Sequence, residues 1–241
     1  MSSPDPRLSR AVTAHAVAVA GLSAAHSLRA RGLRRTLLFA TLANAIPAIG
    51  EYLAINVLGS LRHHTRPQSR GVPLPITLGW YNISYATFSV AESLVAGADP
   101  GGSGRGSSLP PITALLATNL DLLLDPAGLD SALWEWTGDG PYAAEIRGRN
   151  DRRGIPLFNF AGWLAIESTI ALAYRFLTAD DGEDETRPGK AGSPEAGRTS
   201  ALLLLLYYLP AAAWASKRRG WKYLLYSLPF LAALWSALKG S

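Results

Sequence analysis

The amino-acid sequence predicts an all-α integral membrane protein, a single domain over residues 1–241 built from about seven transmembrane helices. Apolar residues make up 48% of the chain, and the charged residues, only 17%, gather in short blocks. Between these blocks lie seven apolar stretches, most of them close to the roughly 20 residues that cross a bilayer core. These stretches are residues 11–28, 36–59, 73–97, 109–125, 155–178, 199–216 and 221–238.

The first stretch, "AVTAHAVAVAGLSAAHSL", has the basic flank of a signal peptide but is long for one, so we expect it to be a transmembrane helix. The fourth stretch ends in "DLLLDP", where Pro126 is expected to end the helix. The stretches 109–125, 199–216 and 221–238 are short for a span, so the number of spans is uncertain by one.

Three connecting segments differ in composition. Residues 97–111 are rich in Gly, Ser and Pro and predict a connector. Residues 178–200 are charged and polar, which predicts a flexible linker. Residues 126–154 contain Trp134, Trp136 and Tyr142, and because Trp and Tyr concentrate at membrane interfaces, we expect an interfacial cap loop.

The net charge of +5 does not require a nucleic-acid partner, and we expect membrane lipid and no nucleic acid. The basic clusters "RARGLRR" and "SKRRGWK" lie at the edges of predicted spans, where they meet lipid headgroups. Their distribution weakly favours a cytoplasmic N-terminus, and we expect the cytoplasmic membrane of a prokaryote. The chain has no cysteine, which excludes disulfides and thiol nucleophiles, and His63 and His64 lack further ligands for a metal site.

Carboxylates inside predicted spans are the most informative residues, because a charge at the bilayer centre costs about 2.5–3.5 kcal/mol and such residues usually have a function. They are Glu51, Glu92, Asp121, Asp125 and Glu167. Glu92 could simply reach water at a helix end, and Glu167 could form an interhelical hydrogen bond or pair with Arg175. Asp121 and Asp125 are four residues apart and so share a helix face. In a low dielectric such a pair does not ionise twice readily, which would leave one aspartic acid protonated as a Brønsted acid.

Four motifs, in this order, resemble the carotenoid biosynthesis family of membrane-bound carotenoid 1,2-hydratases, which includes bisanhydrobacterioruberin hydratase. They are "GVPLPITLGW" (71–80), "DLLLDP" (121–126), "WEW" (134–136) and "GIPLFNFAGW" (154–163). The resemblance spans about residues 45–175. It implies the addition of water across the terminal double bond of an acyclic carotenoid, without a redox cofactor.

The sequence departs from the family pattern at two loops. "LGSLRHHTRPQSR" stands where the family has a Gly/Tyr-rich stretch, and "AAEIRGRNDRR" (143–153) is inserted before the Pro–Asn–Phe segment. Both departures fall on predicted cap or entry loops and leave the candidate acid in place.

The chemistry of the residues agrees with this resemblance. Protonating an alkene needs an acid in a dry site and aromatic faces that stabilise the carbocation. We expect Asp121, Asp125 and Glu51 to be catalytic. The residues expected to bind a lipophilic isoprenoid are Asn44, Trp80, Tyr81, Tyr85, Trp134, Asn159, Phe160, Trp163 and Glu167.

Two other functions stay open on the sequence alone. An integral membrane terpene cyclase would use the same carbocation chemistry, with an internal alkene in place of water, and would need Mg²⁺ only if its substrate were a prenyl diphosphate. A non-catalytic lipid-binding or scaffold protein would leave the buried carboxylates unexplained.

Overall fold

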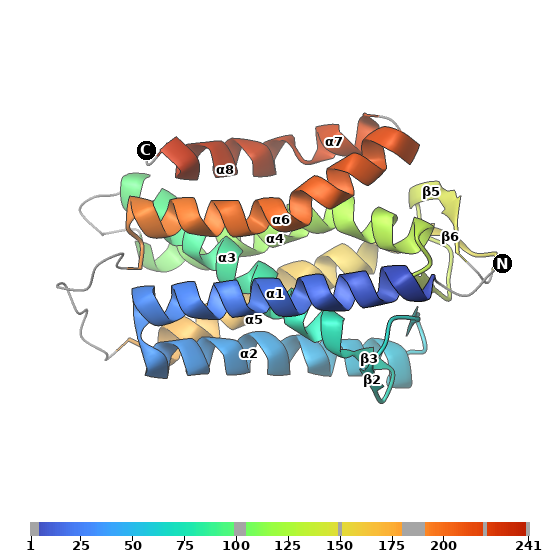
Figure 1. Ribbon diagram of the computed structural model, residues 1–241, viewed down its shortest axis with the longest axis horizontal. Helices are drawn as coiled ribbons and strands as arrows, with labels where there is room; N and C mark the ends of the chain where they lie inside the picture. The colour runs from blue at the N-terminus through green and yellow to red at the C-terminus, as the bar shows by residue number, and fades with distance from the viewer. Residues whose placement is uncertain (1–4, 99–104, 149–150, 180–190, 219–220, 240–241) are drawn as a thin grey trace.

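A computed structural model describes residues 5–98, 105–148, 151–179, 191–218 and 221–239. Its long helices run roughly along one axis, and the short strands lie together at the end of the bundle where the chain begins (Figure 1). The helices are α1 (Pro6–Arg31), α2 (Leu33–Tyr52), the π-helix η1 (Leu53–Val57), α3 (Leu74–Ala98), α4 (Arg105–Asp130), α5 (Leu157–Leu177), α6 (Pro194–Arg218), α7 (Lys222–Tyr226) and α8 (Leu228–Lys239). The strands are β1 (Leu61–His63), β2 (Gln68–Ser69), β3 (Val72–Pro73), β4 (Trp134–Trp136), β5 (Tyr142–Arg147) and β6 (Arg153–Ile155).

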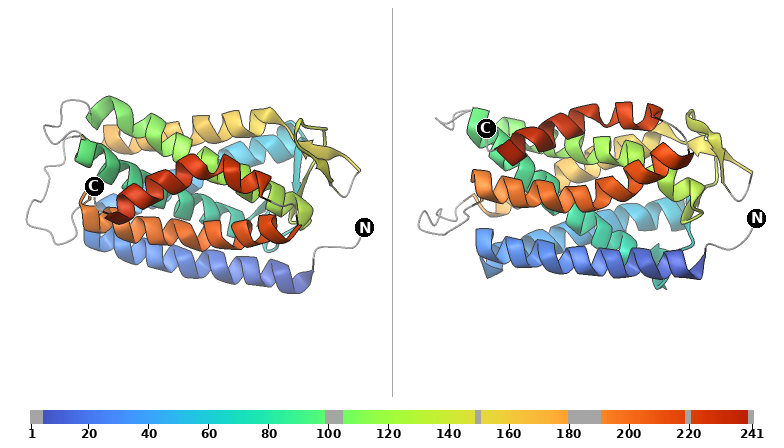
Figure 2. Two further views of the ribbon diagram at one scale, coloured as in Figure 1. Left: turned by 90° about the horizontal axis from the view of Figure 1, so that it is seen from above. Right: turned by 45° about the horizontal axis from the view of Figure 1, so that its top comes forward.

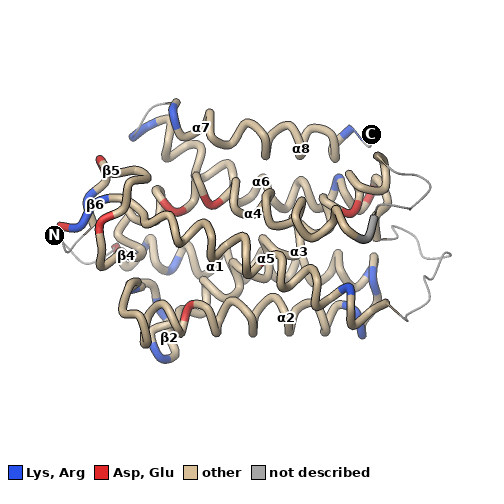
Figure 3. The backbone as a smooth tube through the Cα atoms, turned by 180° about the vertical axis from the view of Figure 1, so that it is seen from behind, with Lys and Arg blue, Asp and Glu red and all other residues tan. Residues whose placement is uncertain are grey.

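The predicted all-α membrane bundle is confirmed. Within the described residues, five helices are long and apolar enough to cross a membrane: α1, α2 with η1, α4, α5 and α6. Lys and Arg gather at the two ends of the bundle, and its long middle carries few charges (Figure 3). This distribution suits a protein whose middle lies in hydrocarbon and whose ends meet headgroups.

Two of the seven predicted spans differ from the others. Helix α3 has the length of a span, but it carries polar residues such as Asn82 and Ser84 and is buried over most of its length. It contacts α1, α2, α4 and α6, so it forms the centre of the bundle. The last predicted span is divided at Ser227 into α7 and α8, which pack against α4 and α6 (Figure 2).

Helices α1 and α2 form a hairpin with a one-residue turn. Gly32 has φ = 80°, a conformation that glycine adopts without strain, and its N–H donates to the Leu28 carbonyl. Just before this turn, Arg31 donates to the carboxylate of Glu92 on α3 at 2.5 Å. The Arg31 guanidinium also lies over the ring of Phe88, 5.2 Å from its centroid. Glu92 therefore forms an ion pair with Arg31 at the end of the bundle remote from the strands.

The strands form three two-stranded antiparallel sheets that pair β1 with β4, β2 with β3, and β5 with β6. Residues 58–73 and the described part of 131–156 form what we call the cap. In the β1–β4 pair, His63 lies opposite Trp134 and Leu61 opposite Trp136. Two segments about 70 residues apart in the sequence are thereby joined at one end of the bundle.

The prediction that Pro126 ends its helix is wrong, because α4 continues to Asp130 with Pro126 inside it. Proline has no N–H to donate to the carbonyl of Leu122, four residues earlier. The hydroxyl of Tyr142, in the cap, donates to this carbonyl instead, at 2.5 Å. A hydrogen bond from outside the helix thus replaces the missing one.

The predicted connectors are shorter than expected. Helix α3 extends to Ala98 and α4 begins at Arg105, so much of 97–111 is helical. Helix α5 ends at Leu177 and α6 begins at Pro194, which makes the end of the predicted linker 178–200 helical. Residues 99–104 and 180–190 lie outside the described residues.

Helices α3 and α6 pack closely at Gly197. A Cβ built on Gly197 would lie 2.2 Å from Oγ and 2.5 Å from Cβ of Ser93. By contrast, a Cβ on Gly21 of α1 would meet nothing within 4 Å. Only a residue without a side chain fits at Gly197, which fixes the distance between the two helices.

We predict that Gly197→Ala destabilises the protein by about 1–3 kcal/mol, because overpacking forces α3 and α6 apart. Gly21→Ala is the matched control and should be neutral or stabilising, since alanine favours the helix by up to about 1 kcal/mol. Thermal unfolding of both variants in detergent measures the difference. Equal melting temperatures for the two variants would contradict the predicted contact.

Candidate active site

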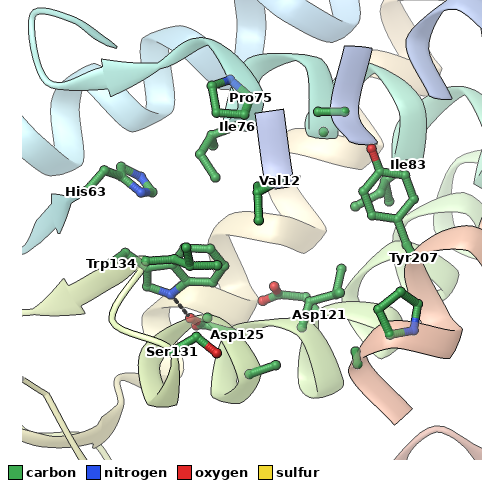
Figure 4. A pocket seen from close by; sticks show the side chains of 18 of the residues that line it. Val12, His63, Pro75, Ile76, Ile83, Asp121, Asp125, Ser131, Trp134 and Tyr207 are labelled. Atoms are coloured by element: carbon green, nitrogen blue, oxygen red, sulfur yellow. Dashed lines mark hydrogen bonds between the residues drawn. The ribbon is translucent and has the colours of Figure 1, made fainter. Parts of the chain in front are cut away.

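A cavity of about 540 Å³ lies inside the bundle at the end that the cap covers. Its walls come from α1, α3, α4, α5 and α6, and strands β1 and β4 contribute His63 and Trp134 at the cap end (Figure 4). Most of the lining is apolar, and it converges on a few polar groups, as ligand sites commonly do. Seven of the residues that the sequence predicts line it: Glu51, Trp80, Asp121, Asp125, Trp134, Asn159 and Trp163.

Asp121 and Asp125 lie one turn apart on α4, and both are almost completely buried. The side-chain amide of Asn159, in the first turn of α5, joins them. Its Nδ2 donates to Oδ2 of Asp121 at 2.9 Å and to Oδ2 of Asp125 at 2.8 Å. One amide group therefore holds two buried carboxyl groups beside each other.

The second oxygen of Asp125 accepts a hydrogen bond from the cap. Nε1 of Trp134 donates to Oδ1 of Asp125 at 2.5 Å, as the dashed line in Figure 4 shows. The Trp134 indole packs directly against α4 at Gly128. A Cβ built on this glycine would lie 2.0 Å from the Trp134 ring. Gly128 is thus required for Trp134 to reach Asp125.

Tyr142 supports the same turn of α4 from the other side. Its hydroxyl bonds the Leu122 carbonyl, between the two aspartates, and its ring packs edge-on against Phe160 at 5.1 Å. Burial, with the neighbouring Tyr223 hydroxyl, raises the pKa of Tyr142, so the hydroxyl keeps its proton and remains a donor. The cap therefore holds the aspartate-bearing turn through two side chains, Trp134 and Tyr142.

Glu51 forms the second polar centre of the cavity. One carboxylate oxygen contacts Nε2 of His63 at 2.9 Å, and the other accepts from Nε1 of Trp80 at 3.1 Å. Trp80 in turn stacks on Trp163, with ring centroids 3.7 Å apart. Sequence reasoning considered His63 only as a metal ligand, whereas the structure places it on Glu51, on the strand β1 that pairs with β4.

Five predicted residues do not line the cavity. Glu167 and Asn44 share helix faces with Asn159 and Glu51, but a separation of seven or eight residues is about 10–12 Å along the axis. Each finds a partner elsewhere: Ser84 donates to Glu167 at 2.7 Å, and Asn44 donates to the Ala40 carbonyl at 2.7 Å. The aromatic rings of the other three pack in the protein core: Tyr81, Tyr85 and Phe160.

The two tyrosines of α3 lie on a different stripe of the helix from the cavity-lining residues. Ile76, Gly79, Trp80 and Ile83 line the cavity, at the three- and four-residue spacing of a single helix face. The hydroxyl of Tyr85 instead bonds Nδ1 of His26 at 2.7 Å.

The cavity also has lining residues that sequence reasoning missed, among them Leu206 and Trp214 of α6. Tyr207 is another, and its hydroxyl accepts from Nδ2 of Asn82 at 2.6 Å. Their positions depend on helix packing, and no local motif points to them. Among the residues that the structure describes, no group of three or more His, Asp or Glu side chains is arranged to hold a metal ion.

Comparison with known proteins identifies the family. A model of the family described as carotenoid biosynthesis protein matches residues 11–204, which include Glu51, both aspartates and Asn159. No curated protein and no solved structure matches the chain. The resemblance recognised in the sequence is confirmed over most of the chain. The protein therefore belongs to the carotenoid biosynthesis protein family, which assigns it a role in carotenoid biosynthesis.

Proposed function

We propose that the protein hydrates the terminal double bond of an acyclic carotenoid, using the buried aspartate pair as the acid. The observation that carries this proposal is the Asn159 bridge between Asp121 and Asp125 in an apolar cavity. Two carboxyl groups held this close in a low dielectric share a single negative charge more readily than they carry two. The site is thus suited to keeping one proton ready for transfer.

Asp121 is the better proton donor of the two. Both oxygens of Asp125 accept N–H groups, from Trp134 and Asn159, and this suits an ionised carboxylate. Asp121 accepts from Asn159 on Oδ2, which leaves Oδ1 for the proton. Figure 4 supports this assignment, because the Asp121 carboxyl group points into the cavity while Asp125 lies beneath the Trp134 indole.

Protonation would proceed as an addition to the terminal alkene. The O–H bond of Asp121 breaks, and the π electrons of the double bond form a new C–H bond at the carbon that already bears hydrogen. The dimethyl carbon is left as a tertiary cation. The indoles of Trp80, Trp134 and Trp163 line the cavity, and each aromatic face contributes about 0.5–2 kcal/mol of cation–π attraction.

Water would complete the reaction. Its oxygen bonds to the dimethyl carbon, and its proton passes to the aspartate pair, which carries two negative charges after the first step and is therefore strongly basic. Glu51, held by His63 and Trp80, faces the same cavity and is placed to orient this water. The product is a tertiary alcohol. The carbon that gains oxygen is oxidised and its neighbour, which gains hydrogen, is reduced by the same amount, so the reaction requires no redox cofactor.

Product analysis tests this function. The protein is co-expressed with enzymes that supply an acyclic carotenoid, and the extracted pigments are analysed by mass spectrometry. We expect a product heavier by one water, with ¹⁸O incorporated from labelled water. An isomer of unchanged mass with a ring at its end would indicate the cyclase chemistry and overturn the hydratase.

We predict that Asp121→Asn and Asp125→Asn each lower the hydration rate by about 100-fold or more, as expected for loss of a general acid or its partner. Asp151→Asn is the control, because Asp151 is exposed and forms a surface ion pair with Arg147. Rates of alcohol formation in membranes containing equal amounts of each variant give the comparison. Activity of either cavity variant close to that of Asp151→Asn would refute the assigned role.

We further predict that Gly128→Ala lowers the rate by about ten- to 100-fold, because the new methyl group displaces the Trp134 indole from Asp125. Gly138→Ala, in the cap, is the matched control, since a Cβ there meets nothing within 4 Å. The same product assay measures both variants, and the tryptophan emission spectrum reports the displaced indole. An unchanged rate in Gly128→Ala would show that the Trp134 contact is dispensable.

A further inference from the structure

The exposure of the residues around the cavity identifies where it opens. Among the lining residues that the structure describes, Ala11, Leu206 and Pro210 are the most exposed, and the others are half-buried or buried. Ala11 belongs to α1, and the other two belong to α6. Both helices are long and apolar enough to span the membrane, so the opening between them faces lipid.

The shape of α6 explains this opening. Pro210 lies inside α6 and has no N–H for the Leu206 carbonyl, and an internal proline bends a helix. Figure 1 shows α6 beside α1 over its first half and bending away from it toward the cap end. The two helices contact each other where the rings of His15 and Tyr207 pack edge-on, with centroids 5.1 Å apart, so the gap lies on the cap side of this contact.

The volume of the cavity sets how much of a substrate it holds. A volume of 540 Å³ corresponds to a sphere about 10 Å across, the size of a pocket for a small ligand. An extended acyclic carotenoid is about as long as the bilayer core is thick, about 30 Å. The cavity therefore accommodates one end of such a molecule, and the remaining polyene has to lie elsewhere.

We propose that the gap between α1 and α6 is a lateral portal for a long acyclic isoprenoid. One end group occupies the cavity beside Asp121, and the polyene passes between Ala11 and Leu206 into the hydrocarbon of the bilayer. This inference rests on the proposed hydratase function for its chemistry. In this arrangement the site binds one end group of the isoprenoid at a time. It accepts isoprenoids of different length, because the part of the polyene outside the portal contacts only lipid.

The closed sides of the cavity support this route. Helix α3 covers one side with buried residues such as Trp80 and Ile83, and α4 forms the floor with Asp121 and Asp125. The cap closes the end with Leu61, Leu133 and Trp136, which are also buried. A route through the cap would lead an apolar polyene toward water, whereas the α1–α6 gap leads it to lipid.

The experiment uses a double variant that narrows the portal, Ala11→Trp with Leu206→Trp. Its matched control is Val17→Trp with Leu202→Trp, because these residues lie on the same two helices, are 51% and 55% exposed, and do not line the cavity. Each protein is supplied with an acyclic carotenoid and, separately, with a ten-carbon isoprenoid hydrocarbon that carries the same end group and fits inside the cavity. Hydration of each substrate is measured.

We expect the portal variant to hydrate the carotenoid about ten-fold or more slowly than the control and to hydrate the short substrate at a similar rate. Unchanged carotenoid hydration in the portal variant would overturn the portal. An equal decrease in the hydration rates of both substrates would also overturn the portal, because the substitutions would then have disturbed the cavity and not only the entry of a long substrate.

Binding separates this inference from the proposed reaction. The carotenoid that co-purifies with each protein is measured by its visible absorbance. If the wild-type protein hydrates neither substrate, the hydratase fails, yet less carotenoid on the portal variant than on the control still supports the portal. Equal carotenoid on the two variants overturns it.

Discussion

The bridge that Asn159 makes between Asp121 and Asp125 is the interaction on which the rest of the site depends. It brings two carboxyl groups together where neither meets bulk water, at hydrogen-bond distances of 2.9 and 2.8 Å. Unbridged, two buried carboxyl groups would repel each other or each take up a proton. The bridge also ties α4 to α5, so the packing of the two helices and the geometry of the acid are fixed by the same contact.

The bundle and the cap contribute different parts of this site. The apolar helices supply a dry cavity and the aspartates, and the cap supplies the side chains that hold them, Trp134 on Asp125 and Tyr142 on the Leu122 carbonyl. His63 reaches Glu51 from the same cap. Because His63 on β1 lies opposite Trp134 on β4, a one-residue shift of either strand would turn its own side chain, His63 or Trp134, to the other face. The cap is therefore part of the site and not only its cover.

Local properties of the sequence predicted the bundle and the aspartate pair, since hydropathy and four-residue spacing are readable from one segment. What the sequence could not predict depends on contacts between distant segments. Pro126 was expected to end α4 because the donor that replaces its N–H is on Tyr142, in the cap. His63 was not expected on Glu51 because its position depends on the strand β1, which pairs with β4 about 70 residues later. Tyr85 follows the helical spacing but faces a neighbouring helix. The spacing alone does not determine which neighbour a helix face contacts, because that depends on how the helices pack.

Infrared difference spectroscopy tests most directly whether the aspartate pair holds one transferable proton. Spectra of the wild-type protein and Asp121→Asn are recorded in lipid nanodiscs at neutral pH, in H₂O and in D₂O. We expect a wild-type C=O band of a protonated carboxylic acid that shifts on deuteration and is lost in the variant. A difference spectrum that contains only carboxylate bands for Asp121 would contradict it.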